Sequence, residues 1–270
     1  MFIPTPHTPQ RLTLFVYRAR WLVLSCGMLL SAAAAADTDR QFAKRLDPTD
    51  FRSRIELRNR FQETPRDGLR NVLTPRLEYA FSKGFALRLE LPVVVHDARN
   101  PGVSTQGGMG DVSVRASFRL LRTESFALIA GTEFLLDTAT DTFLGSAHHS
   151  IGPFLLMSIN APAIHSTLFP FLQSVHSFAG DAGRDPLNYT LARLFVLTRW
   201  PAQWYSGSEI AIYIDHEHSG RVGNTLELEM GRFLNKHVAL WARPGIGAWG
   251  NDVPMIYKWN MEVGLRYLFD

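Results

Sequence analysis

Four arginines share one parity of the segment FRSRIELRNRF at residues 51–61, namely Arg52, Arg54, Arg58 and Arg60. Side chains two residues apart lie on the same face of a β-strand, so this spacing would place four guanidinium groups in a row. In a soluble sandwich such a row faces water. In the wall of a narrow passage the same row would create a field that orients polar solutes.

A serine and a histidine could do covalent chemistry. Ser174 and His176 share a face of the segment 164–178. A serine hydrolase needs its hydroxyl in hydrogen-bond contact with a base that a third group holds. Residues two apart on a strand are separated by about 6.5 Å, so we expect no direct contact and regard cross-strand pairing as the one way to supply it. A lipid hydrolase is therefore the less favoured alternative, and we predict that the protein is not an enzyme.

The other histidines and the glycines do not predict a cofactor site. His216 and His218 share a face at a strand end, but zinc requires three or four ligands. Gly107, Gly108 and Gly110 precede a strand, whereas the glycines of a phosphate loop precede a helix. We therefore expect neither a metal nor a cofactor.

The elements that carry these residues are strands. In GGMGDVSVRASFRLLR at residues 107–122, apolar and polar side chains alternate, with Val112, Val114, Ala116, Phe118 and Leu120 opposing Asp111, Ser113, Arg115, Ser117 and Arg119. A helix, with a period of about 3.6 residues, would have mixed the two sets around its circumference. The segment therefore predicts a strand with one oily face and one charged face.

The same pattern recurs along the chain and predicts twelve strands, at residues 51–61, 69–81, 85–96, 110–122, 126–136, 150–160, 164–178, 187–199, 205–217, 224–233, 237–248 and 255–269. From the second strand onward, loops of about eight to thirteen residues alternate with turns of about three to five, as in outer-membrane barrels with long outer loops and short periplasmic turns. The last strand ends near the C-terminus, where we expect the barrel-assembly machinery to recognise it. After the first 36 residues, no segment of the sequence predicts a membrane-spanning helix.

Aromatic residues gather at the predicted short turns and indicate an interfacial girdle: Phe81, Phe85, Trp200, Trp204, Tyr205, Tyr267 and Phe269. Five prolines fall within predicted strands, at positions 75, 92, 153, 170 and 244. Because proline cannot donate to a strand ladder, we expect bulges or strand ends there.

In a membrane barrel the oily parity contacts outer-membrane lipid and the charged parity lines the lumen, with every backbone group paired. The predicted lumen residues are Arg52, Arg54, Glu56, Arg58, Arg60, Arg76, Glu78, Arg88, Glu90, Arg115, Arg119, Glu133, Glu209, Asp215, Glu227, Glu229, Lys258, Glu262 and Arg266. A secreted double-sheet sandwich would show the same period, but its connections would have no reason to alternate in length.

The first 36 residues predict an export signal. Arg11, Arg18 and Arg20 precede an apolar run at 21–30, and small residues follow at 31–36. A membrane anchor is the alternative, but the run is shorter than the roughly 20 residues that span a bilayer. After this segment we predict a polar leader at 37–50 and one barrel domain at 51–270.

Removal of the signal changes the charge balance. Three of the 28 Lys and Arg lie in it and none of the 25 Asp and Glu, which leaves 25 against 25. The basic pI therefore gives no reason to infer a nucleic-acid partner. The single cysteine, Cys26, leaves with the signal, which suits a compartment where stray disulfides form.

Two segments together show a resemblance to a known family. LRLELPVVV at 87–95 and, after a loop, GGMGDVSVRASFRLL at 107–121 resemble the outer-membrane barrels labelled with the MetA pathway of phenol degradation, often called transporters. The shared pattern of Gly110-Asp111, an alternating strand and Phe118-Arg119-Leu120 extends over about a third of the chain. The resemblance implies an outer-membrane protein that moves small organic or aromatic molecules, and it supplies no catalytic residues.

We therefore expect a twelve-stranded barrel in the outer membrane of a Gram-negative bacterium. Its expected role is the porin-like passage of small solutes, hydrophobic or aromatic compounds among them. Strands one and twelve would form a basic wall, and Glu209, Asp215, Glu227 and Glu229 an acidic wall. The alternative is a plugged structural or surface-interaction barrel, because a narrow lumen favours charges that pair with each other.

Overall fold

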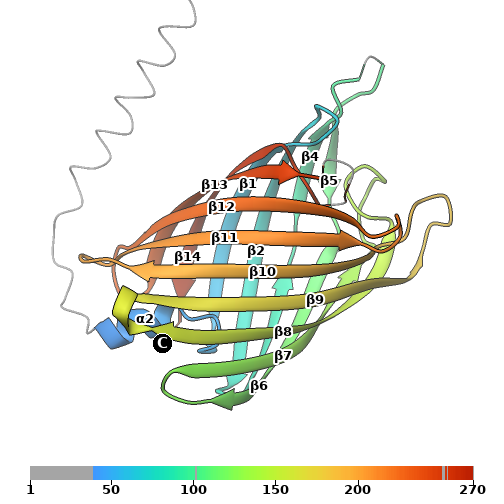
Figure 1. Ribbon diagram of the computed structural model, residues 1–270. Coiled ribbons are helices and arrows are strands. Elements are labelled where there is room, and N and C mark those ends of the chain that lie inside the picture. The colour runs from blue at the N-terminus through green and yellow to red at the C-terminus, as the bar shows by residue number, and fades with distance from the viewer. Residues whose placement is uncertain (1–38, 101, 251–252, 254, 270) are drawn as a thin grey trace, which may run out of the picture. The chain divides into compact units, whose positions relative to one another are not determined.

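The computed structural model describes residues 39–100, 102–250, 253 and 255–269 of the chain (Figure 1). The predicted signal segment and Cys26 lie outside these residues. Within the described part of the chain, no helix is long and apolar enough to cross a membrane. The described residues form one antiparallel sheet, a short helix near its N-terminus and a 3-10 turn.

The sheet closes on itself, because β1 pairs with both β2 and β14. Its segments are β1 (Arg54–Glu63), β2 (Leu69–Ser82), β3 (Phe85–Glu90), β4 (Val93–Asp97), β5 (Gln106–Met109), β6 (Val112–Arg122), β7 (Phe126–Leu136), β8 (His148–Ala161), β9 (Ser166–Gly180), β10 (Asn188–Arg199), β11 (Trp204–Asp215), β12 (Arg221–Phe233), β13 (Val238–Trp249) and β14 (Trp259–Leu268). β3 and β4 together pair with β2, and β5 and β6 continue one another on the next strand. The predicted twelve-stranded antiparallel barrel is therefore confirmed.

Each of the five prolines lies at an interruption of one strand ladder, but the expected bulge or strand end is found only at Pro92, and the other four lie inside continuous strands. Pro92 separates β3 from β4, and Pro75 lies opposite that break. The β8–β9 ladder skips the positions of Pro153 and Pro170, and the β12–β13 ladder skips that of Pro244. Each interruption accommodates a residue that has no amide hydrogen to donate.

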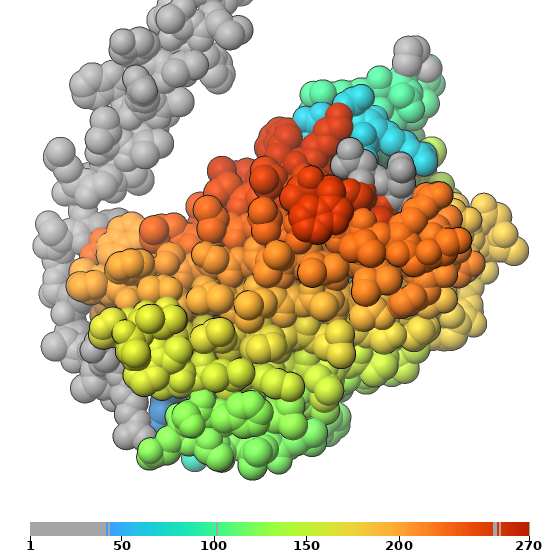
Figure 2. All heavy atoms as spheres, viewed as in Figure 1, coloured from blue at the N-terminus to red at the C-terminus, as the bar shows by residue number. Residues whose placement is uncertain are grey.

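The two faces of the sheet differ as the alternation predicts. On β1, Ile55 and Leu57 are 46% and 44% exposed, whereas Arg54 and Glu56 are 7% and 1% exposed. Exposed Leu, Ile, Val, Met and Phe side chains recur around the outer wall. Figure 2 shows the closed outer surface that the atoms of β8 to β13 form on one side of the barrel. The charged parity therefore points into the barrel and the apolar parity outward, as lipid contact requires.

Large aromatic side chains inside the barrel lie over glycines of adjacent strands. A Cβ atom added to Gly131 would overlap the ring of Phe154, and one added to Gly231 would overlap the ring of Tyr205. The same holds for Gly264 and Trp241. Tyr205 was predicted to belong to the outer girdle, but it is 1% exposed and lies inside, because Gly231 leaves room for its ring there.

Replacing Gly231 by Val should destabilise the barrel by about 1–3 kcal/mol, since the new side chain must displace Tyr205 from a packed cluster. Unfolding in urea, followed by tryptophan fluorescence, would measure this loss. Gly84→Ala is the matched control, because the nearest atom to its added Cβ is 3.8 Å away. Equal stability of both variants would show that the contact between Gly231 and Tyr205 carries no packing constraint.

The segment predicted as a polar leader contains an amphipathic helix, α2 (Asp39–Leu46), at the end of the barrel where the short turns lie (Figure 1). Phe42 and Leu46 are buried in a cluster with inward-facing side chains of β9 to β14, among them Phe233 and Trp241. Arg45 donates to Gln203 Oε1 and to the carbonyl of Asn235.

The residues after α2 bind the opposite wall of the barrel. Asp47 pairs with Arg122 at 3.3 Å, and the carbonyl of Thr49 accepts a hydrogen bond of 2.6 Å from Arg119 on β6. Helix and following segment together therefore cross the interior from β9–β14 to β6. We call residues 39–50 the plug segment.

Two loops turn inward at the opposite end. In the β7–β8 loop, Leu144 is 1% exposed and its carbonyl accepts a hydrogen bond from Arg70, while Ser146 donates to Asp111. In the segment before β14, Val253 and Tyr257 are buried. The interior is therefore narrowed at both ends by the chain's own segments.

Candidate channel lumen

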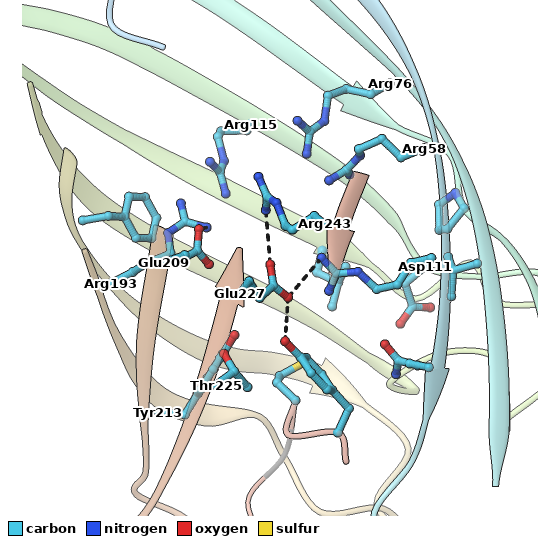
Figure 3. Close-up of a pocket in the computed structure, with 18 of the residues that line it drawn as sticks. Arg58, Arg76, Asp111, Arg115, Arg193, Glu209, Tyr213, Thr225, Glu227 and Arg243 are labelled. Atoms are coloured by element: carbon cyan, nitrogen blue, oxygen red, sulfur yellow. Dashed lines mark hydrogen bonds and ion pairs between the residues drawn. The ribbon is translucent and has the colours of Figure 1, made fainter. Parts of the chain in front are cut away.

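A central cavity of about 950 Å³ lies inside the barrel, between the plug segment and the inturned loops. Figure 3 shows Arg58, Arg76, Arg115 and Arg243 projecting into it from different strands. The closed sheet fixes these positions, because inward and outward side chains alternate along each paired strand.

Three glutamates on neighbouring strands are held by arginines. Glu56 lies 2.5 Å from Arg266 and 3.0 Å from Arg76. Glu78 lies 3.0 Å from Arg54 and 2.6 Å from Arg88. Glu90 lies 2.9 Å from Arg58 and 2.7 Å from Arg76. Each carboxylate therefore has two guanidinium partners, which a buried charge requires.

A second cluster lies on β12 to β14. Arg243 pairs with Glu229 and with Glu227, the latter at 3.3 Å. The pair of Arg243 and Glu227 is drawn in Figure 3. Glu227 also accepts hydrogen bonds from Tyr257 at 2.6 Å and from Asn260 at 2.8 Å. The cluster ties an inturned segment to the barrel wall.

A third group combines cations with aromatic rings. Arg115 on β6 pairs with Glu133 at 2.6 Å, and Glu133 also accepts from Gln173. The guanidinium carbons of Arg115 and Arg193 lie 5.6 Å and 4.5 Å from the ring centre of Phe171, within cation–π distance. Arg193 has a distant carboxylate neighbour, Glu209, at 3.9 Å. Its guanidinium is therefore held by a ring rather than by a close acid.

The structure places the predicted lumen residues in three sets. Those that line the cavity are Arg54, Glu56, Arg58, Arg60, Arg76, Arg88, Arg115, Glu209, Glu227, Glu229 and Arg266. Glu78, Glu90, Glu133 and Glu262 pair with these arginines without lining the cavity. Arg52, Arg119, Asp215 and Lys258 lie apart from it.

The residues that lie apart have other partners. Arg52 pairs with Asp50 and Arg119 binds Thr49, both in the plug segment. Asp215 lies 2.8 Å from His218 at the loop end of β11. Lys258 pairs with Asp67 in the β1–β2 loop, and its ammonium group holds the pKa of the Asp67 carboxyl below its usual range.

The expected separation into a basic and an acidic wall is wrong. Arg243 lies among the acids of β12, and Glu56 and Glu262 lie among the arginines of β1 and β14. Strand parity alone predicts which residues face inward. The balance of positive and negative charge on each wall depends on cross-strand neighbours, which the sequence order does not show.

Several cavity-lining or cavity-closing residues were not predicted from the sequence, among them Arg70, Arg193, Arg243 and Tyr257. Arg193 and Arg243 share the inward parity of their strands with buried Leu191 and Trp241, and this parity could have identified them. Tyr257 lies in a loop, where side chains do not alternate between two faces and the sequence pattern therefore does not indicate their direction.

The surface that faces the cavity is richer in arginine than the interior as a whole. Eleven arginines line it, at positions 54, 58, 60, 70, 76, 88, 115, 184, 193, 243 and 266, against six carboxylates, those of Glu56, Asp111, Asp185, Glu209, Glu227 and Glu229. Four further glutamates pair with these arginines from behind, so the excess of arginine over carboxylate applies to the side chains that face the cavity rather than to the barrel interior as a whole.

The fold resembles that of solved outer-membrane channels. The COG4313 outer membrane channel from Pseudomonas putida F1 is similar over 83% of this chain and 100% of its own, with a TM-score of 0.64 and 12% identity. The KdgM porin covers 80% of this chain and 99% of its own, with a TM-score of 0.56 and 14% identity. The NanC porin covers 79% and 98%, with a TM-score of 0.57 and 9% identity.

The protein is therefore an all-β barrel with the fold of outer-membrane porins and channels. At these identities the likeness concerns the fold alone. No protein-family model matches the sequence, and no curated protein does. The label of the phenol-degradation family is accordingly not confirmed, and it stays a prediction from the two segments that suggested it.

Proposed function

We propose that this protein is an outer-membrane channel of a Gram-negative bacterium that passes small solutes and favours anions. The observation that carries the proposal is the arginine-rich surface of the central cavity, which attracts negative solutes and repels positive ones. The exposed apolar outer wall supports the membrane location, since a soluble protein would bury such a surface.

The geometry also supports solutes with an apolar or aromatic part, in line with the sequence expectation. The rings of Phe171, Phe195 and Tyr213 line the cavity beside the arginines. A small carboxylate with a planar apolar part could bind a guanidinium and a ring together. The similar KdgM porin has also been solved in complex with oligogalacturonate, whose sugars bear carboxylates.

Planar lipid bilayers test the proposal. The folded protein should form discrete channels whose reversal potential in a salt gradient shows preference for chloride over potassium. Benzoate should reduce the chloride current more than acetate at equal concentration, since it adds contact with the rings. Preference for potassium over chloride would contradict the proposal that the channel favours anions. Equal block of the chloride current by benzoate and acetate would contradict the proposal that the solutes have an aromatic part.

Replacing Arg58 by Ala should weaken the chloride preference while the barrel stays folded. Arg58 lines the cavity, and the carboxylates beside it keep other partners, Arg76 for Glu90 and Arg60 for Glu262. Reversal potentials measured in parallel would show the shift toward potassium. Arg52→Ala is the matched control, because Arg52 lies apart from the cavity. An unchanged selectivity in Arg58→Ala would remove this residue from the conducting path. Arg54 is a less suitable target, because it is 7% exposed and its loss would also disturb folding.

A plugged structural barrel is the second candidate, and the plug segment with the inturned loops specifically favours it. It predicts no conductance from a barrel that is demonstrably folded. A band shift on heating in gel electrophoresis would establish the folded state in the same preparation.

A further inference from the structure

The outer wall carries a polar cluster near the end of the barrel where the long loops lie. On β9, Gln173 and Val175 face inward and are buried, whereas Ser174 and His176 point outward. The Ser174 Oγ and His176 Nε2 atoms are 2.8 Å apart, which is hydrogen-bond distance. The expectation that these side chains cannot meet is therefore wrong. It took the spacing of the backbone as the spacing of the reacting atoms, but the imidazole reaches back along the strand.

The neighbouring strand places two further polar groups beside this pair. In the β9–β10 register, Asn188 lies directly opposite His176 and Thr190 directly opposite Ser174. Directly opposed residues of antiparallel strands share a face, with their Cβ atoms about 5 Å apart. The Thr190 Oγ1 atom in turn lies 2.9 Å from His216 Nε2. A hydroxyl, a base that contacts it, an amide beside the base and a second hydroxyl beside the first therefore adjoin on the lipid-facing side.

We propose that Ser174 and His176 form the catalytic pair of a lipid ester hydrolase on the outer face of the barrel. The pair has the contact that nucleophilic serine catalysis requires. Its position also fits the substrate. The polar cluster lies near the loop ends of β9 and β10, since β9 ends at Gly180 and β10 begins at Asn188. In a membrane barrel the strand ends lie near the bilayer interface, and the carboxylic esters of lipids lie there too. The site is separate from the lumen, so it does not depend on the channel function.

The reaction follows from these positions. The Ser174 hydroxyl attacks the ester carbonyl carbon while His176 Nε2 accepts its proton. The tetrahedral intermediate collapses, the ester C–O bond breaks, and the leaving lipid alcohol takes that proton from His176. Water then attacks the acyl-serine and gives a proton to His176, the fatty acid leaves, and Ser174 recovers its proton. One ester and one water thus give one alcohol and one acid.

Two residues would assist without reacting. With His216 in the tautomer whose Nε2–H donates to Thr190 Oγ1, the Thr190 hydroxyl proton can be donated to the oxygen that becomes negative in the intermediate. The Asn188 side chain, beside His176, would act as a positioning residue that keeps the imidazole in the tautomer with a free Nε2. Both roles are consequences of the cross-strand register rather than of sequence proximity.

The test uses the full-length folded protein in phosphatidylcholine vesicles with a radiolabelled acyl chain. The wild-type protein should release fatty acid, and a fluorophosphonate probe should label Ser174, identified by mass spectrometry. Ser174→Ala should abolish both, and His176→Ala should reduce hydrolysis by about 10²–10⁴-fold. Asn188→Ala should lower kcat more than it raises KM, and should change the pH profile.

Ser208→Ala is the matched control. Ser208 is exposed on the same outer wall, but its cross-strand neighbours are Val196 and Leu228. Its activity and labelling should equal those of the wild type. The proposal is overturned if the folded wild-type protein neither hydrolyses lipid nor reacts with the probe, or if Ser174→Ala retains the activity. A band shift of Ser174→Ala on heating in gel electrophoresis, equal to that of the wild type, shows that the barrel is intact and keeps this test independent of the channel proposal.

Discussion

Removal of residues 39–49 is expected to raise the single-channel conductance several-fold. These residues form most of the plug segment, in which Phe42 and Leu46 fill the turn end of the lumen and Asp47 binds the opposite wall. The barrel should survive, because β1 begins at Arg54 and its pairing with β2 and β14 does not involve the plug. Bilayer recordings of the shortened and the full-length protein would measure the difference.

A reversible lock provides the control. The rings of Phe42 and Phe233 are 5.9 Å apart, so cysteines at these positions can be joined by a short linker with two methanethiosulfonate ends, which a reductant cleaves. The described residues contain no native cysteine to interfere. Locked channels should conduct at the low level of the full-length protein. Cleavage of the linker should leave the plug segment free to move again. If the shortened protein conducts no better, the narrow region lies elsewhere, at the inturned loops.

The barrel could be predicted from the sequence because its physical cause is local. Each strand of a lipid-facing barrel must present apolar side chains at every second position, and β6 and β12 show this alternation plainly. The long and short connections follow from the two different ends of the barrel. The existence of the strands, and the outward parity of those whose two faces differ in polarity, therefore followed from a period of two.

The interior could be predicted less well. The faces of β9 could not be assigned because inward Phe169 and Phe171 are as apolar as outward Leu172. These rings are inside because α2 and Arg193 contact them, and no periodicity reports such contacts. The helix itself was not predicted, because it is a single short amphipathic segment that is stabilised by the barrel around it.

Arg243→Ala should destabilise the barrel by about 3 kcal/mol, the lower end of the range for loss of one partner of a buried pair. Among the described residues, Arg243 is the ion-pair partner of Glu229, and it also contacts Glu227. Both carboxylates are at most 6% exposed, so without the guanidinium they remain charged and poorly solvated. Urea unfolding in lipid vesicles would measure the loss, and reversal potentials should shift toward potassium.

The double variant Arg243→Ala with Glu229→Gln separates charge from packing. If the uncompensated carboxylate causes the loss, the second substitution should restore most of the stability, since it removes the charge and keeps the shape. A double variant as unstable as Arg243→Ala would instead assign the effect to the lost contacts of the arginine with Trp241 and Phe195.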